Sequence, residues 1–127
     1  VSDFMIPIQE CPVIKSNESN LKTTLETIEN GKLGFCLVLN NQQKLEGLIS
    51  SADIRKSLLN NLSNLDGLSV EKMINPKPLT VFDHNTVIDL LQIIKSAKFP
   101  VMYLPVVDEG FKAKGIVNFV HLIKGEV

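Results

Sequence analysis

The stretch that decides the fold is Gly47-Leu48-Ile49-Ser50-Ser51-Ala52-Asp53-Ile54. Its apolar residues predict a buried strand, and Ser50 or Ser51 then begins a helix, because serine is a preferred residue at helix N-termini. A carboxylate, Asp53, follows in the first turn of that helix. The stretch therefore predicts a strand that ends at a helix N-terminus, where exposed backbone amides attract anions.

The same pattern returns at Gly115-Ile116-Val117-Asn118, an offset of 68 residues. Working outward, an offset of 66 aligns residues 12–21 with 78–87, and both segments lead from a proline through polar residues into an amphipathic helix. The offset of 68 also aligns residues 38–40 with 106–108, and Asp3 and Met5 with Glu71 and Met73. Because four blocks keep their order and type, we infer an internal repeat.

Each copy reads as strand, helix, strand, hairpin, strand and helix. In the first copy, Ser19 or Asn20 caps a helix that runs to about Asn30. In the last helix of this copy, we expect Ile54, Leu58 and Leu59 to face the core. The remaining predicted strands are 35–39, 45–49, 102–107 and 114–117, and the remaining helices are 69–74, 86–97 and 118–124. We assign the first repeat to residues 1–62, a linker to 63–68 and the second repeat to 69–127.

A single copy has about 60 residues, and a unit of that size buries too little surface to be comfortably stable alone. Its strands are apolar on both faces, which indicates burial on both. We therefore predict an α/β (α+β) fold in which two β-α-β-β-α repeats pack through their sheets with pseudo-two-fold symmetry. Such a joint forms two related clefts, and ligands often bind at joints.

The composition excludes several classes of function. The 127 residues carry a net charge of -1, so there is no basic excess to bind nucleic acid. The apolar run at residues 100–107 is too short to span a membrane. Cys11 and Cys36 are too few for a disulfide framework, so we expect two buried thiols in a reducing, cytoplasmic compartment. The spacing of Cys and His predicts no metal site, and the start at Val1 without Met suggests an excised fragment.

The motif at residues 47–54 has two interpretations. A phosphate could bind at the helix N-terminus and the hydroxyl of Ser50, while Asp53, which only accepts hydrogen bonds when ionised, suits the diol of a ribose. The base would then lie deeper in the cleft. Alternatively, Ser50 and Asp53 merely cap the helix reciprocally. Spacing alone does not decide between a nucleotide site and a capping box.

The repeat resembles the CBS domain, and two in tandem resemble a Bateman module. The resemblance covers nearly the whole chain and rests on residues 3–5 and 71–73, the strands after Pro12 and Pro78, and the motif at 47–54. In that family the Ser or Thr contacts phosphate, the Asp holds ribose, and the first and middle strands enclose adenine. The resemblance thus implies a nucleotide site in the first repeat formed by Pro12, Val13, Ile14, Gly34, Phe35, Ser50 and Asp53.

The second copy departs from this pattern. Asn118 replaces the hydroxyl, and His121 replaces the carboxylate that would hold ribose. A neutral histidine can bond one hydroxyl but cannot accept two bonds as a carboxylate does. Nucleotide binding at the second cleft is therefore doubtful, although an apolar pocket remains expected there; this second set is Leu79, Thr80, Phe99, Pro100, Met102, Asn118 and His121.

The other polar residues favour ordinary structural roles. We expect His84 to lie on the surface beside a helix start and Tyr103 to pack in the core or at its rim. Arg55 and Lys56 either reach a phosphate or line a solvated helix face. No arrangement typical of a catalytic triad, nucleotide-binding glycine loop or carboxylate pair is present, so we predict that the chain is not an enzyme.

These observations predict a regulatory module that binds an adenine-type nucleotide and needs no cofactor. Candidate ligands are AMP, ADP, ATP and S-adenosylmethionine. The resemblance further suggests a homodimer and a missing catalytic or transporter domain, similar to pairs fused to arabinose-5-phosphate-type sugar-phosphate isomerases or to sugar nucleotidyltransferases. The alternative is a structural dimerisation module whose clefts no longer bind.

Overall fold

The structure is a computed structural model and describes residues 3, 5–17, 20–65, 68–97 and 103–118. The chain divides into two compact units. One consists of residues 12–77, and the other combines residues 1–11 with 78–127. These units differ from the predicted sequence repeats, which comprise residues 1–62 and 69–127.

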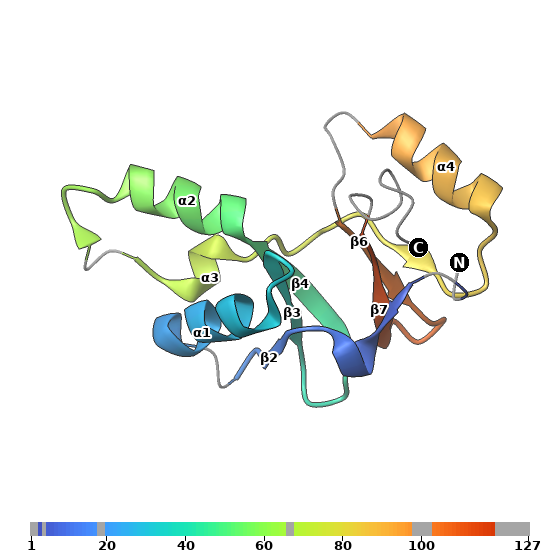
Figure 1. Ribbon diagram of the computed structural model, residues 1–127, viewed down its shortest axis with the longest axis horizontal. Helices are drawn as coiled ribbons and strands as arrows, with labels where there is room; N and C mark the ends of the chain where they lie inside the picture. Colours follow the sequence, from blue (N-terminus) through green and yellow to red (C-terminus); the bar gives the residue numbers. More distant parts are fainter. Residues whose placement is uncertain (1–2, 4, 18–19, 66–67, 98–102, 119–127) are drawn as a thin grey trace. The chain divides into compact units, whose positions relative to one another are not determined.

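The unit of residues 12–77 is a three-stranded sheet with helices packed on it (Figure 1). Strand β2 is parallel to β3, and β3 is antiparallel to β4, which gives the order β2-β3-β4. The core of this unit joins residues of the sheet with residues of α1 and α3, and comprises Ile14, Ile28, Cys36, Val38, Ile49, Val70 and Met73. Its elements are β2 (Val13–Lys15), α1 (Leu21–Gly31), β3 (Phe35–Leu39), β4 (Leu45–Ser50), α2 (Ser51–Asn60) and α3 (Val70–Met73).

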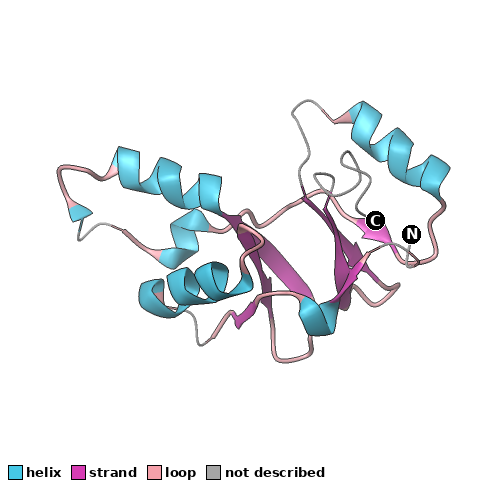
Figure 2. Ribbon diagram, in the orientation of Figure 1, coloured by secondary structure: helices cyan, strands magenta, loops and turns pink. Residues whose placement is uncertain are grey.

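The other unit contains a four-stranded sheet in the order β1-β7-β6-β5, whose strands Figure 2 colours magenta. Helix α4 packs on it through Leu90, with Ile93 and Ile94 beside it. The buried sheet residues of this core are Val81, Leu104, Val106 and Val117. The elements are β1 (Ile6–Pro7), the short 3-10 helix η1 (Ile8–Glu10), β5 (Val81–Phe82), α4 (Val87–Ser96), β6 (Tyr103–Val107) and β7 (Ala113–Asn118).

The segments that precede Pro12 and Pro78 each pair with the last strand of the other repeat. Strand β1 pairs with β7, aligning Ile6 with Ile116. In the other unit, Asn75 exchanges two backbone hydrogen bonds with Leu48 of β4, of 2.8 and 3.1 Å. This exchange explains why residues 1–11 belong to one unit with the second repeat.

The mixed α/β class is confirmed, and so are the helix starts that the capping residues predicted. The side chain of Asn20 accepts a hydrogen bond from the backbone N–H of Thr23 at 2.9 Å, and Ser69 caps α3 in the same way. Every residue of β3 is buried, which confirms burial on both faces of this strand. Of the predicted helix at 118–124, Asn118 is the last residue of β7, and residues 119–124 lie outside the described residues, as do the linker residues 66 and 67.

The prediction that Leu58 and Leu59 face inward is wrong. Their side chains are 39% and 66% exposed, and α2 buries its apolar face mainly through Ile54. The partner of α2 on this side is α3, whose four residues span about 6 Å against about 15 Å for the ten residues of α2. The second half of α2 therefore keeps its leucines uncovered by the described residues.

The two cysteines are free thiols in this structure. Cys36 is fully buried, as predicted, whereas Cys11 is only half-buried. Burial raises the pKa of each thiol to about 12, with Glu10 adding to the effect at Cys11. Within the described ranges, no helix combines the length and apolar character needed to span a bilayer.

Candidate functional site

The predicted residues of the first repeat come together at one edge of the β2–β3–β4 sheet. Because β2 and β3 are parallel and β4 is antiparallel to them, β2 and β3 start at the edge where β4 ends. Phe35 aligns with Ser50, and the backbone N–H of Leu37 donates to the carbonyl of Pro12 at 2.9 Å. The edge therefore joins the start of β2, the start of β3 and the passage from β4 to α2.

The turn that enters β3 is shaped by Gly34. Its φ of 80° lies in the left-handed region that favours glycine. The carbonyl of Gly34 accepts a hydrogen bond from the backbone N–H of Ser51 at 2.9 Å, which ties this turn to the first residue of α2. Of the residues expected to enclose a base, Ile14 and Phe35 are buried, while Val13 and Gly34 are half-buried.

Ser50 and Asp53 form the capping box that the second interpretation of the motif predicted. The backbone N–H and the hydroxyl of Ser50 donate to Asp53 Oδ2 at 2.9 and 3.0 Å, and the backbone N–H of Asp53 lies 3.2 Å from Ser50 Oγ. Both hydrogen bonds that the carboxylate accepts thus end on one oxygen. Among the described residues, no donor reaches the other oxygen, Oδ1.

The capping box also limits the donors available at the helix N-terminus. The N–H groups of Ser51 and Asp53 already have partners, whereas that of Ala52 donates to none of the described residues. Arg55 and Lys56 are exposed in the next turn, so they lie on a solvated face. A negatively charged ligand would therefore meet one open amide, one hydroxyl that is already engaged, and a carboxylate.

The second set is only partly described. Leu79 and Thr80 are half-buried just before β5, and Asn118 is 8% exposed at the end of β7. Phe99, Pro100, Met102 and His121 lie outside the described residues.

Tyr103 has in the second repeat the position that Phe35 has in the first, and the sequence analysis did not include it in the second set. It aligns with Asn118 in the same way that Phe35 aligns with Ser50, and the repeat offset of 68 contained that signal. Tyr103 is half-buried, in keeping with the predicted core or rim position, and burial raises the pKa of its phenol.

His84 is exposed, as predicted. Its ring stacks on that of Phe82, with centroids 5.3 Å apart and planes at 6°. No group of three or more His, Cys, Asp or Glu side chains suited to a metal ion occurs in the part of the chain that the structure describes. The stacking on Phe82 gives His84 a structural role on the surface of its unit.

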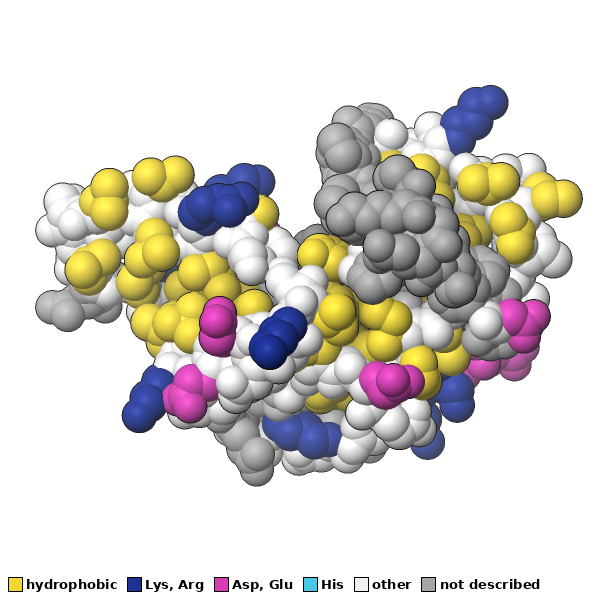
Figure 3. Space-filling model, viewed as in Figure 1, with side chains coloured by type: hydrophobic (Ala, Val, Ile, Leu, Met, Phe, Trp, Pro, Cys, Tyr) yellow, Lys and Arg dark blue, Asp and Glu magenta, His cyan; other side chains and the backbone are white. Residues whose placement is uncertain are grey.

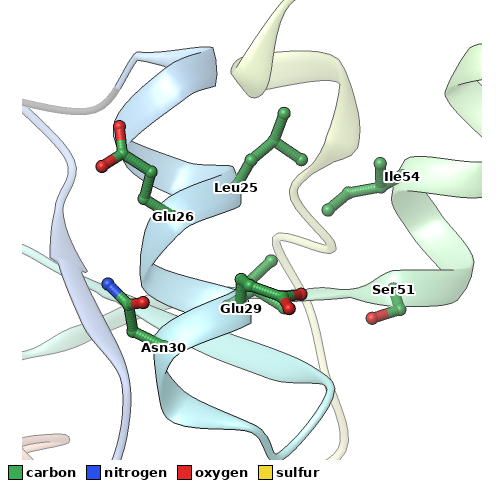
Figure 4. A pocket seen from close by; sticks show the side chains of 7 residues that line it. Leu25, Glu26, Glu29, Asn30, Ser51 and Ile54 are labelled. Atoms are coloured by element: carbon green, nitrogen blue, oxygen red, sulfur yellow. The ribbon is translucent and has the colours of Figure 1, made fainter.

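A separate hollow that the sequence did not predict lies between α1 and α2 (Figure 4). It has a volume of about 490 Å³ and combines apolar with acidic and neutral polar side chains. We call it the α1–α2 groove, and its lining residues are Leu25, Glu26, Ile28, Glu29, Asn30, Ser51 and Ile54.

Comparison with known proteins shows relatives over the full length of the chain. The model of the CBS domain matches twice, at residues 1–60 and 70–126. An uncharacterized protein of Chlamydia pneumoniae is 29% identical over 98% of this chain, which spans 38% of that relative's length. The chain spans only 20% of a CBS domain-containing protein of Arabidopsis thaliana to which it is 23% identical.

Two solved structures illustrate the likeness in fold. The structure of CBSX2 from Arabidopsis thaliana in complex with AMP matches with a TM-score of 0.76 and 27% identity, covering 98% of this chain and 93% of CBSX2. A CBS domain-containing protein of unknown function from Bacillus anthracis matches with a TM-score of 0.80 and 20% identity, covering 100% and 94% of the two chains.

Proposed function

This chain belongs to the CBS domain family, and from that premise we propose that it is a regulatory module that binds an adenine nucleotide at the edge of the β2–β3–β4 sheet. The observation that carries the proposal is the pair Ser50 and Asp53, held where β4 passes into α2 beside the turn at Gly34. The AMP complex of CBSX2, which is 27% identical to this chain, supports the choice of ligand.

The geometry suggests a role for each group. Asp53 Oδ1 is open to accept hydrogen bonds from the ribose hydroxyls, while Oδ2 keeps the helix cap. The N–H of Ala52 and the hydroxyl of Ser50 would donate to phosphate, so the hydroxyl must leave Asp53 Oδ2 when the ligand binds. The segment Pro12–Ile14, together with Gly34 and Phe35, would enclose the base.

We assign nucleotide binding to the first repeat alone. The second set offers Asn118 where the first repeat has Ser50, and an amide replaces the hydroxyl. The role of His121 and of the apolar residues 99, 100 and 102 in a second pocket stays a prediction.

The regulatory part of the proposal concerns sequence outside this chain. CBS domain pairs are regulatory modules, and binding can shift a partner domain only if the ligand prefers one of its states. We propose that this module acts in the cytoplasm as a homodimer and biases an attached domain, for which a sugar-phosphate isomerase or a sugar nucleotidyltransferase is our candidate.

Ligand titration tests the binding function directly. AMP, ADP, ATP and S-adenosylmethionine are each titrated calorimetrically, and thermal unfolding is recorded with and without them. A nucleotide present at 100 times its Kd should stabilise the fold by about 2.7 kcal/mol. If none of the four releases heat or raises the melting temperature, the chain is instead the structural dimerisation module that the sequence left as the alternative.

A further inference from the structure

Gly31, the last residue of α1, lies directly against the ring of Pro12. A β-carbon on Gly31 would overlap Cγ of that ring and lie 3.0 Å from its Cβ and 3.5 Å from its Cδ. The φ of Gly31 is not positive, so its backbone conformation is open to other residues. The close approach of the proline ring is therefore what requires glycine at the end of α1.

Pro12 connects this contact to the proposed nucleotide site. Its side chain is buried against α1, and its carbonyl accepts a hydrogen bond from the backbone N–H of Leu37 at 2.9 Å. Pro12 is thus fixed from two sides, by α1 and by β3. Val13 follows it in the chain and is half-buried, so it keeps surface that a base could contact. Pro12 therefore acts in the site by placing Val13, and Gly31 acts by placing Pro12.

A side chain at position 31 would displace one of two segments, and both belong to the base side of the proposed site. One is β2, a strand of three residues at the outer edge of the β2–β3–β4 sheet. The other is the turn after α1, which leads through Lys32, with a φ of 57°, to Gly34. Since Pro12, Val13 and Gly34 are proposed to enclose the base, movement of either segment would change that enclosure.

The second repeat differs at this contact. The offset of 66 residues places Pro78 at the position of Pro12 and Ala97 at that of Gly31. By this alignment α4 ends one residue earlier than α1, at Ser96, and Ala97 has an extended backbone. Pro78 is half-buried, whereas Pro12 is buried. The first repeat thus combines a helical glycine with a buried proline, and the second does not.

We propose that Gly31 is a positioning residue of the nucleotide site, because it lets Pro12 lie against α1 and thereby fixes Val13 beside the base. This role rests on the proposed nucleotide binding. Figure 3 shows hydrophobic side chains gathered on the surface of the unit of residues 12–77, and the buried Pro12 is not among the exposed ones. Replacing Gly31 or Pro12 therefore leaves the exposed apolar surface unchanged, and a change in affinity reports on the site.

Calorimetric titration of the whole chain with AMP tests this role. Gly31→Ala should raise the Kd for AMP about tenfold, because the displaced segments no longer hold the base side of the site in one arrangement. The matched control is Ile28→Val, which loosens the core beneath the same helix and adds no atom near Pro12. It should lower the melting temperature and leave the Kd unchanged.

A second substitution, Pro12→Ala, separates positioning from a merely structural role. It removes the ring atoms that a side chain at position 31 would overlap. Gly31→Ala made in the Pro12→Ala background should therefore change the Kd less than about twofold, although it changes the Kd about tenfold in the unmodified chain. If Gly31→Ala alone does not fold, the comparison of Pro12→Ala with the double variant carries the test, and a further tenfold loss in the double variant would overturn the proposal.

The remaining outcomes distinguish this role from the proposed function. A Gly31→Ala protein that is less stable but binds AMP with unchanged Kd would show that the glycine serves packing alone. In that case the positioning role fails while nucleotide binding stands. Equal effects of Gly31→Ala with and without Pro12→Ala would overturn the role as well. An unmodified chain that does not bind AMP would instead overturn the proposed function, and the positioning role with it.

Discussion

Ser50 and Asp53 satisfy each other's hydrogen bonds at the start of α2, with the serine hydroxyl 3.0 Å from Asp53 Oδ2 and the aspartate N–H 3.2 Å from Ser50 Oγ. The capping box and the proposed nucleotide site therefore share the same two residues. The cap uses one carboxylate oxygen and leaves the other open, so ribose binding does not require the helix start to unfold. Phosphate binding does require the serine hydroxyl to change its acceptor.

The first prediction concerns Gly47, which lies against Ile74 and Asn75, just before Pro78. A β-carbon at this position would meet the side chain of Ile74 and lie 2.8 Å from the carbonyl oxygen of Asn75. Gly47→Ala should therefore lower the free energy of unfolding by about 1–3 kcal/mol in urea denaturation, as overpacking does.

Gly110→Ala is the matched control for that substitution. Its β-carbon would lie 3.5 Å from Asp108 Oδ1, an ordinary contact. This variant should unfold at nearly the same urea concentration as the unmodified protein. Equal losses of stability in both variants would show that the close packing at Gly47 is not the cause.

The second prediction concerns the hairpin between β3 and β4. Gln43 has a φ of 65°, in the left-handed region where a β-carbon is unfavourable. Gln43→Gly should raise the free energy of unfolding by about 0.5 kcal/mol. The backbone strain that glycine removes is larger than the entropy cost of ordering its more flexible unfolded chain. Gln42→Gly, one residue earlier, should lower it, because φ there is not positive. Changes of the same sign in the two variants would contradict the argument.

The third prediction is a pH dependence at the start of α4. Hydrogen bonds from the backbone and the hydroxyl of Thr86 hold the pKa of Asp89 below its ordinary value of 3.8, and His84 adds to the effect. A carboxyl whose pKa is lowered on folding stabilises the fold above its unfolded pKa and loses that effect as pH falls through the folded pKa. Asp89→Asn should therefore show a smaller drop in melting temperature than the unmodified protein when pH is lowered from about 6 to about 2.5. An identical drop in both proteins would argue against this role.

The fourth prediction separates the two thiols. Burial raises the pKa of both thiols to about 12, so their exposure distinguishes them, and the side chain of Cys36 is 0% exposed. In native protein treated with iodoacetamide, mass spectrometry of peptides should find Cys36 alkylated only at the rate of unfolding. The half-buried Cys11 should react earlier. Rapid labelling of Cys36 without loss of structure would show that the core of this unit opens more readily than its packing indicates.

Local signals in the sequence were sufficient for the repeat, for strands β2 to β7 and for the described helix starts, but not for β1. The capping residues Asn20, Ser50 and Ser69 act within three residues of their partners, so their patterns can be read directly from the chain. The exchange of leading segments could not be predicted in this way. The pairing of Ile6 with Ile116 joins residues 110 positions apart, and nothing in the local pattern specifies it.

Part of the candidate site could also be predicted from the sequence. The residues of the first set converge because β2, β3 and β4 meet at one edge, which follows from the strand order. The exposure of Leu58 and Leu59 did not follow from periodicity, because it depends on the short length of α3. The α1–α2 groove likewise arises from how two helices pack, which neither helix encodes alone.

The central claim, that Asp53 holds a nucleotide through the oxygen that the helix cap leaves open, is tested most directly by AMP titration of two matched variants. Asp53→Asn and Asp89→Asn each neutralise the aspartate of a capping box while leaving a side-chain oxygen to accept the cap's hydrogen bonds. Calorimetry should show the Kd for AMP raised about tenfold to a hundredfold by Asp53→Asn, as expected for lost hydrogen bonds to a charged group, and unchanged by Asp89→Asn. An unchanged Kd in the Asp53→Asn protein would contradict the account.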